Sequence, residues 1–206
     1  MIAVPTQHAA ADVAPSLALW LVRRRFSIDD YYRMAESGVI APDERTELLD
    51  GQVVFQLTIN ARHAGCVNRL NQFLSRQLID RAIVAVQNPL RLGPYSEPQP
   101  DIALLRPRED SYDRSHPHPE DVLLLIEVAD SSLDLDRRVK MPLYAAAGIA
   151  EVWLIDLAND AVEVYRDPDA RGYRQLQRSS RGSSLTALLL PDMQVGIDEV
   201  LGAALD

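Results

Sequence analysis

The sequence has very little cysteine and no long apolar run. Its single cysteine, Cys66, cannot form an internal disulfide or a cysteine-rich zinc site, which agrees with a reducing compartment. The apolar stretch 17–22 is far shorter than the roughly 20 residues of a membrane-spanning helix. Arginines follow it at 23–25, where a signal peptide would carry its basic residues before the apolar part. We therefore expect a cytoplasmic protein that contacts no membrane.

Basic residues are outnumbered by acidic ones, and the difference is unevenly distributed. The 206 residues include 21 Lys and Arg against 30 Asp and Glu, a net charge of −9. Residues 1–108 carry 12 basic and 11 acidic side chains, whereas residues 109–206 carry 9 and 19. A polyanion must therefore approach the first half or a local basic pocket, because the second half repels it. Tight non-specific binding of nucleic acid is not expected.

Lysine is almost absent: 20 of the 21 basic residues are arginines, and the single lysine is Lys140. A sequence that uses arginine wherever either cation would serve can keep its lysine where a compact, titratable amine is needed. Codon bias explains the same pattern equally well. The surroundings of Lys140 therefore decide between the two interpretations.

Apolar periodicity and turn residues predict one α+β domain over residues 25–206, preceded by an extension over residues 1–24. The pair Asp50-Gly51 predicts a hairpin turn, because both residues tolerate positive φ. The apolar run 122–128 is typical of a central strand that is buried on both faces. The expected helices cover 27–37, 61–81, 137–147 and 200–205, and the third has a loop or kink at Pro142. Residues 130–136 are expected to form a turn. The expected strands cover 46–49, 52–55, 83–87, 101–106, 122–128, 152–157, 161–166 and, as an edge strand, 172–177.

Two carboxylates stand beside apolar strand segments. Glu127 follows the apolar run 122–126, where an ionised carboxylate is costly to bury unless a metal or a lysine accompanies it. Asp101 opens another apolar strand directly after Pro100. Carboxylates at the ends of neighbouring strands can point into one cleft and hold a hard divalent cation through their oxygen atoms. Lys140, 13 residues after Glu127, could return to that cleft.

These residues and their neighbours resemble the Uma2 family of restriction-endonuclease-like proteins, which belongs to the PD-(D/E)XK nuclease superfamily. The resemblance extends from residue 26 to about residue 200. It rests on Glu-Leu-Leu-Asp-Gly at 47–51, Pro-Asp at 100–101, Ile-Glu-Val at 126–128 and, most specifically, residues of the block 127–156. It implies a restriction-endonuclease-like core, in which helices flank a mixed central β-sheet.

The resemblance also implies a role for each candidate residue. Asp101 and Glu127 would be metal ligands, and Glu47 would complete the acidic cluster as a further metal ligand. Lys140 would orient the attacking water or stabilise the transition state. The cofactor would be Mg²⁺ or Mn²⁺ and the substrate DNA. The lysine expected in the wider superfamily two residues after the glutamate is replaced by Ala129, so Lys140 has to supply the amine from another element.

Each candidate also has a purely structural interpretation. Asp101 could cap a turn, Glu47 could face solvent from the hairpin, and Glu127 with Lys140 could form a structural ion pair.

The function that the four residues together indicate is a divalent-metal-dependent endonuclease. The alternative is a catalytically inactive nuclease-fold protein that binds a protein or nucleic acid. Binding of a divalent metal discriminates between them. A homodimer is expected for duplex cleavage on grounds of symmetry alone.

Four further residues are expected to be structural. Tyr144 and Trp153 are expected in the core, and Cys66 is expected to be a small buried hydrophobe. His63, near the start of the long helix, is interpreted as a polar helix-start residue in preference to an auxiliary acid or base.

Overall fold

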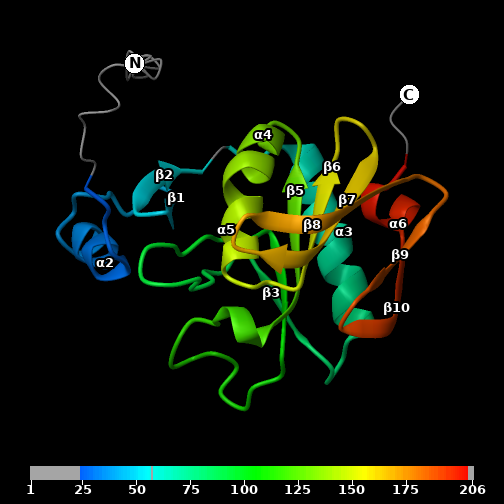
Figure 1. The fold of residues 1–206 in the computed structure, drawn as a ribbon, viewed down its shortest axis with the longest axis horizontal. Coiled ribbons are helices and arrows are strands. Elements are labelled where there is room, and N and C mark those ends of the chain that lie inside the picture. Colours follow the sequence, from blue (N-terminus) through cyan, green and yellow to red (C-terminus); the bar gives the residue numbers. More distant parts are fainter. Residues whose placement is uncertain (1–23, 57, 204–206) are drawn as a thin grey trace.

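A computed structural model describes residues 24–56 and 58–203, so the expected N-terminal extension lies almost entirely outside the described residues. Six strands form a mixed central sheet in the order β3-β4-β5-β6-β7-β8 (Figure 1). Neighbouring strands are antiparallel, except that β5 and β6 are parallel. The strands are β3 (Ile83–Val86), β4 (Ile102–Leu105), β5 (Val122–Ala129), β6 (Glu151–Asp156), β7 (Ala161–Asp169) and β8 (Gly172–Ser180). The predicted mixed sheet is confirmed.

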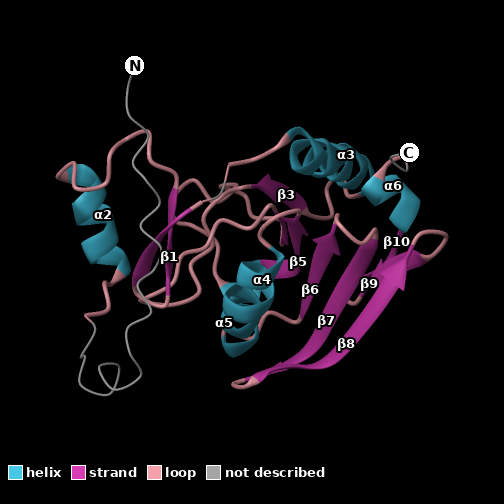
Figure 2. Ribbon diagram, turned by 90° about the horizontal axis from the view of Figure 1, so that it is seen from above, coloured by secondary structure: helices cyan, strands magenta, loops and turns pink. Residues whose placement is uncertain are grey.

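Helices cover both faces of this sheet (Figure 2). Helices α3 and α6 pack on one face together with the β9–β10 hairpin, and α5 packs on the other. No helix in the described part of the chain is long and apolar enough to cross a lipid bilayer. The elements outside the sheet are α2 (Ile28–Glu36), β1 (Thr46–Leu49), β2 (Gln52–Phe55), α3 (Ala61–Gln77), the 3₁₀ turn η1 (Pro119–Asp121), α4 (Leu133–Leu135), the π-helical segment η2 (Asp136–Lys140), α5 (Met141–Ala146), β9 (Ser184–Ala187), β10 (Leu190–Gly196) and α6 (Ile197–Leu201).

Strand β5 is the central strand that its apolar run predicts, and all eight of its residues are buried. Successive side chains of a strand point to opposite faces of the sheet. Leu124 and Ile126 accordingly join the core beneath α3, and Leu125 joins the core beneath α5. Glu127 has the same parity as Leu125. Its carboxylate therefore points to the face that carries α5 and η2.

The hairpin of β1 and β2 turns at Asp50-Gly51, as predicted. The φ angles of Asp50 and Gly51 are 48° and 76°, the left-handed values that a two-residue hairpin turn requires. Glu47 pairs with Val54 across the hairpin, so it lies on the first strand as expected. A Cβ atom added to Gly51 would lie 2.6 Å from Arg25 Cβ. The turn therefore requires glycine both for its φ angle and for space.

The helical segment before Gly148 differs from its prediction. It begins at Leu133 inside the expected turn 130–136, passes through η2 and continues as α5. Pro142 lies in the first turn of α5, directly after η2. The wider hydrogen bonds of a π-helix already interrupt the regular α-helical hydrogen-bonding pattern there, so the missing N–H of proline is tolerated. The predictions of a turn as far as residue 136 and of a helix start at residue 137 are therefore wrong, because the helical segment already begins at Leu133.

Other boundaries differ as well, and strands β7 and β8 extend to Asp169 and Ser180, beyond their expected ends at 166 and 177. Helix α3 ends at Gln77 and not at residue 81. Helix α6 begins at Ile197, before the expected start at residue 200, and ends at Leu201; residues 204 and 205 of the expected helix lie outside the described residues. The hairpin of β9 and β10 was not predicted. Its strands alternate buried apolar residues with exposed ones, and Leu185 and Ala187 are buried because the sheet and α3 share one core with them.

Candidate active site

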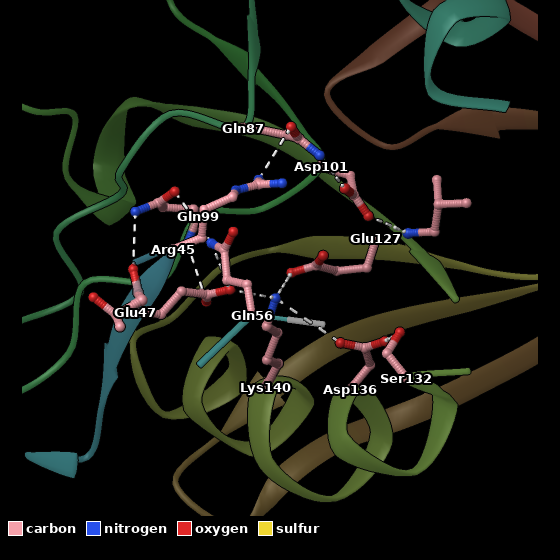
Figure 3. A network of polar contacts seen from close by, with 12 residues as sticks. Arg45, Glu47, Gln56, Gln87, Gln99, Asp101, Glu127, Ser132, Asp136 and Lys140 are labelled. Carbon is pink, nitrogen blue, oxygen red and sulfur yellow. Dashed lines mark hydrogen bonds and ion pairs between the residues drawn. The ribbon is translucent and has the colours of Figure 1, made fainter. Parts of the chain in front are cut away.

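One pocket is lined by all four predicted site residues, Glu47, Asp101, Glu127 and Lys140 (Figure 3). Asp101 precedes β4 and Glu127 lies near the end of β5. Because these strands are antiparallel neighbours, with Ile102 opposite Ile126, the start of one meets the end of the other. Glu47 enters from β1, and Lys140 enters from the last residue of η2. The fold therefore brings together four residues that are distant in the sequence.

Lys140 lies at the centre of a buried cluster of carboxylates. Its Nζ atom lies 3.2 Å from Glu127 Oε1, 3.4 Å from Glu47 Oε1 and 3.9 Å from Asp136 Oδ1. Glu47 is only 6% exposed, so its interpretation as a solvent-facing hairpin charge is wrong. One ammonium group cannot neutralise three carboxylates. The cluster therefore has a surplus of negative charge or holds additional protons.

Two carboxyl groups of this cluster, those of Glu127 and Asp136, have raised pKa values. Burial raises the pKa of Glu127 to about 8, although the charge of Lys140 opposes this shift. Burial also raises the pKa of Asp136. Burial alone would lower the pKa of Lys140, but the negative charges of Glu127 and Glu47 outweigh it and raise that pKa. Lys140 therefore stays charged, and the raised pKa values of Glu127 and Asp136 favour their protonated forms.

Tyr144 adds a second donor to Glu127. Its hydroxyl donates a hydrogen bond of 2.5 Å to Glu127 Oε1, the oxygen that Lys140 also contacts. Burial raises the pKa of Tyr144, so the hydroxyl keeps its proton. Tyr144 is buried as expected, but it also orients the carboxylate. Trp153 and Cys66 are buried core residues, as predicted.

Asp101 is held by a separate set of donors. The Val128 N–H donates to Asp101 Oδ2 over 2.9 Å, and His63 Nε2 donates to the same oxygen over 3.0 Å. Gln87 Nε2 donates to Asp101 Oδ1 over 3.1 Å. Burial alone would raise the pKa of Asp101, but the hydrogen bond and charge of His63, together with the Val128 N–H, lower it below its usual value. Asp101 is therefore an ionised carboxylate.

His63 lies at the start of α3, as predicted, but its ring faces the pocket. The hydrogen bond to Asp101 raises the pKa of His63 against the opposing effect of burial. Its other ring nitrogen, Nδ1, is buried and has no hydrogen-bond partner among the described residues. The interpretation as a helix-start residue alone is therefore incomplete, because His63 is part of the site.

Several polar residues of the site were not identified from the sequence. Gln56 Nε2 donates to Glu47 Oε1 over 3.1 Å, and the Gln99 N–H donates to Glu47 Oε2 over 3.2 Å. Ser132 Oγ donates to Asp136 Oδ2 over 2.6 Å. Asp136 stands four residues before Lys140, a spacing that places two side chains on one helical face and could have indicated their contact. Nothing in the local sequence marks the two glutamines.

The donor set fits a hard divalent cation. Asp101 and Glu127 offer carboxylate oxygens to one pocket, and Mg²⁺ is typically held by one or two carboxylates, with waters and substrate phosphates completing its shell. In the described part of the chain, no three His, Cys, Asp or Glu side chains are grouped as ligands of one ion. The pocket is lined by the acidic Glu47, Asp101, Glu127, Asp130 and Asp136 and by the basic Arg45, His63 and Lys140.

Comparison with known proteins agrees with this architecture. A solved structure from Anabaena variabilis, described as "a putative nuclease belonging to DUF820", matches with a TM-score of 0.60 and 16% identity, over 85% of this chain and 97% of that chain. A search of the curated proteins found no match. The model of the Uma2 family, described as "Putative restriction endonuclease", matches residues 28–199. The chain therefore belongs to the Uma2 family.

Proposed function

We propose that this protein is a Mg²⁺- or Mn²⁺-dependent endonuclease that hydrolyses phosphodiester bonds of DNA. The observation that carries the proposal is the juxtaposition of Asp101 and Glu127, from the ends of adjacent strands, in one pocket with the only lysine of the chain. Membership of a nuclease-like family supports this chemistry and a nucleic-acid substrate.

In this proposal Asp101 and Glu127 hold the cation, and Glu47 completes the acidic cluster. A bound divalent cation supplies Lewis acidity and neutralises charge on the phosphate. Lys140 contributes a compact positive charge that can orient water or stabilise the negative charge developing on the phosphate oxygens. The hydrogen bonds from Val128 N–H, Gln87 and His63 fix the orientation of Asp101, and Tyr144 fixes that of Glu127.

The acidic surplus favours a second candidate. With a net charge of −9, the chain as a whole repels a polyanion. A nuclease-fold protein that binds a partner and cleaves nothing would keep the same core and pocket but would not need a divalent metal. Cleavage and its metal requirement therefore separate the two candidates.

The test is cleavage of supercoiled plasmid DNA with Mn²⁺ or Mg²⁺ as the only divalent cation. We expect the wild type to nick or linearise the plasmid and Asp101→Asn to be inactive. Asp192→Asn is the matched control, because Asp192 has a side chain that is 83% exposed and lies outside the pocket. It should cleave like the wild type. Wild-type inactivity with both metals, or equal activity of the two Asp→Asn variants, would contradict the proposal.

A further inference from the structure

Arg45 differs from the other basic groups that line the pocket, Lys140 and His63, because no carboxylate among the described residues pairs with it. Lys140 lies against three carboxylates. Arg62, at the start of α3, pairs with Asp160 at 3.2 Å. Arg45 is exposed, lines the same pocket as Asp101 and takes part in no ion pair of the described chain. Its guanidinium charge is therefore available to a ligand.

The position of Arg45 is built into the fold. It immediately precedes β1, and its carbonyl oxygen accepts a 2.9 Å hydrogen bond from the Gln56 N–H where the hairpin ends. Its side chain extends toward Gln87, beside Asp101 (Figure 3). The guanidinium is therefore held at the edge of the pocket next to one of the two proposed metal ligands.

Gln87 separates the positive charge of Arg45 from the negative charge of Asp101. Gln87 Oε1 accepts from Arg45 Nη2 over 3.4 Å, while Gln87 Nε2 donates to Asp101 Oδ1 over 3.1 Å. A side-chain amide can accept from a guanidinium and donate to a carboxylate at the same time. Gln87 directly follows β3 with a φ of 52°, a value that is uncommon for residues other than glycine and that recurs at functional sites. A direct ion pair would engage the guanidinium of Arg45 with Asp101; with Gln87 between them, the guanidinium contacts an uncharged amide.

We propose that Arg45 binds a backbone phosphate of the nucleic-acid substrate beside the Asp101–Glu127 pair. The inference rests on the proposed function and adds to it a substrate-binding residue. A pocket lined by five acidic side chains repels a phosphodiester unless local positive charge compensates. Arginine suits this role because its planar guanidinium can donate two parallel hydrogen bonds to one phosphate.

The test measures binding and not cleavage. A short fluorescent DNA duplex is titrated with protein in Ca²⁺, a hard cation with oxygen ligands, and anisotropy is followed at several salt concentrations. Arg45→Ala should weaken binding about tenfold and reduce the salt slope by about one. Arg171→Ala removes the same charge from an exposed position in the turn between β7 and β8, outside the pocket, and should change neither quantity.

Arg45→Lys keeps the charge but loses the bidentate geometry, so it should retain the salt slope and lose part of the affinity. Thermal melts check that the variants fold, which we expect because the Arg45 side chain is exposed. Equal binding by Arg45→Ala and Arg171→Ala would overturn the role of Arg45 and leave the proposed nuclease intact. A wild-type protein that binds no DNA would overturn both.

Discussion

Replacing Lys140 by methionine is expected to destabilise the fold, and more strongly at high pH than at low pH. Methionine keeps an unbranched stem but removes the ammonium group that lies 3.2 Å, 3.4 Å and 3.9 Å from three carboxylates. Removing one partner of a buried ion pair typically costs about 3–5 kcal/mol, because the remaining charge is left buried without compensation.

Two opposing effects set the size of the loss. At an effective dielectric constant of about 20, two charges about 4 Å apart attract by about 4 kcal/mol, and Lys140 has three such neighbours. Against this, Glu127 and Asp136 can take up protons, since burial already raises both pKa values. We therefore expect Lys140→Met to lower the free energy of unfolding by about 3 kcal/mol at pH 8 and by less at pH 5. For a chain of this size, about 3 kcal/mol corresponds to a fall in melting temperature of roughly 6–12 °C.

The assay is thermal unfolding followed by circular dichroism at pH 5 and pH 8. Arg138→Met is the matched control, because Arg138 lies in the same segment but its side chain is 79% exposed, and its ion-pair partner among the described residues is the exposed Asp134. The free energy of unfolding of Arg138→Met should fall by less than about 0.5 kcal/mol. The double variant Lys140→Met/Glu127→Gln should recover part of the stability by removing one uncompensated carboxylate. Equal melting temperatures for Lys140→Met and Arg138→Met at pH 8 would refute this account of the cluster.

Three other substitutions test separate parts of the structure. Glu127→Gln should flatten the dependence of stability on pH. The pKa of Glu127 in the folded protein is about 8, above the usual 4.5, so between these pH values the folded wild type binds more protons than the unfolded chain. The wild type therefore loses stability as the pH rises through this interval. Parallel melting curves across pH for the two proteins would contradict this. Lys140→Arg should keep the charge but lose most plasmid cleavage, because a planar guanidinium cannot occupy the position of the ammonium group; full activity would leave Lys140 a structural role only. Gly51→Val should destabilise the fold by about 2 kcal/mol, since it places a β-branched residue at positive φ against Arg25, and an unchanged melting temperature would contradict the turn assignment.

The sequence predicts those elements whose causes are local. The apolar run of β5 and the Asp50-Gly51 turn have short-range signals, and both occur where expected. The β9–β10 hairpin was not predicted, because Pro191 interrupts its second strand and its apolar residues are buried only by packing with α3 and the sheet. The π-helical turns of η2 were also not predictable, because a shift in helical hydrogen bonding leaves no clear trace in the pattern of apolar residues.

The same distinction applies to the site. Glu127 and Asp101 could be identified because each places a carboxylate beside an apolar strand, where its burial needs an explanation. His63 lies 38 positions before Asp101, and only the packing of α3 over the start of β4 makes them partners. Gln87 reaches Asp101 through a left-handed backbone conformation that its residue type does not favour. Contacts of this kind depend on the tertiary structure and not on local sequence.

Calorimetric titration of the wild type, Asp101→Asn and Asp192→Asn with Mn²⁺ tests the central claim, that Asp101 and Glu127 form a divalent-metal site. The account predicts one binding site in the wild type and in Asp192→Asn, and its loss in Asp101→Asn. At ten times its Kd the ion should stabilise the wild type by about 1.4 kcal/mol, which thermal melts of the same samples would detect. A wild type that binds no Mn²⁺, or an Asp101→Asn variant that binds it as tightly as the wild type, would contradict the claim.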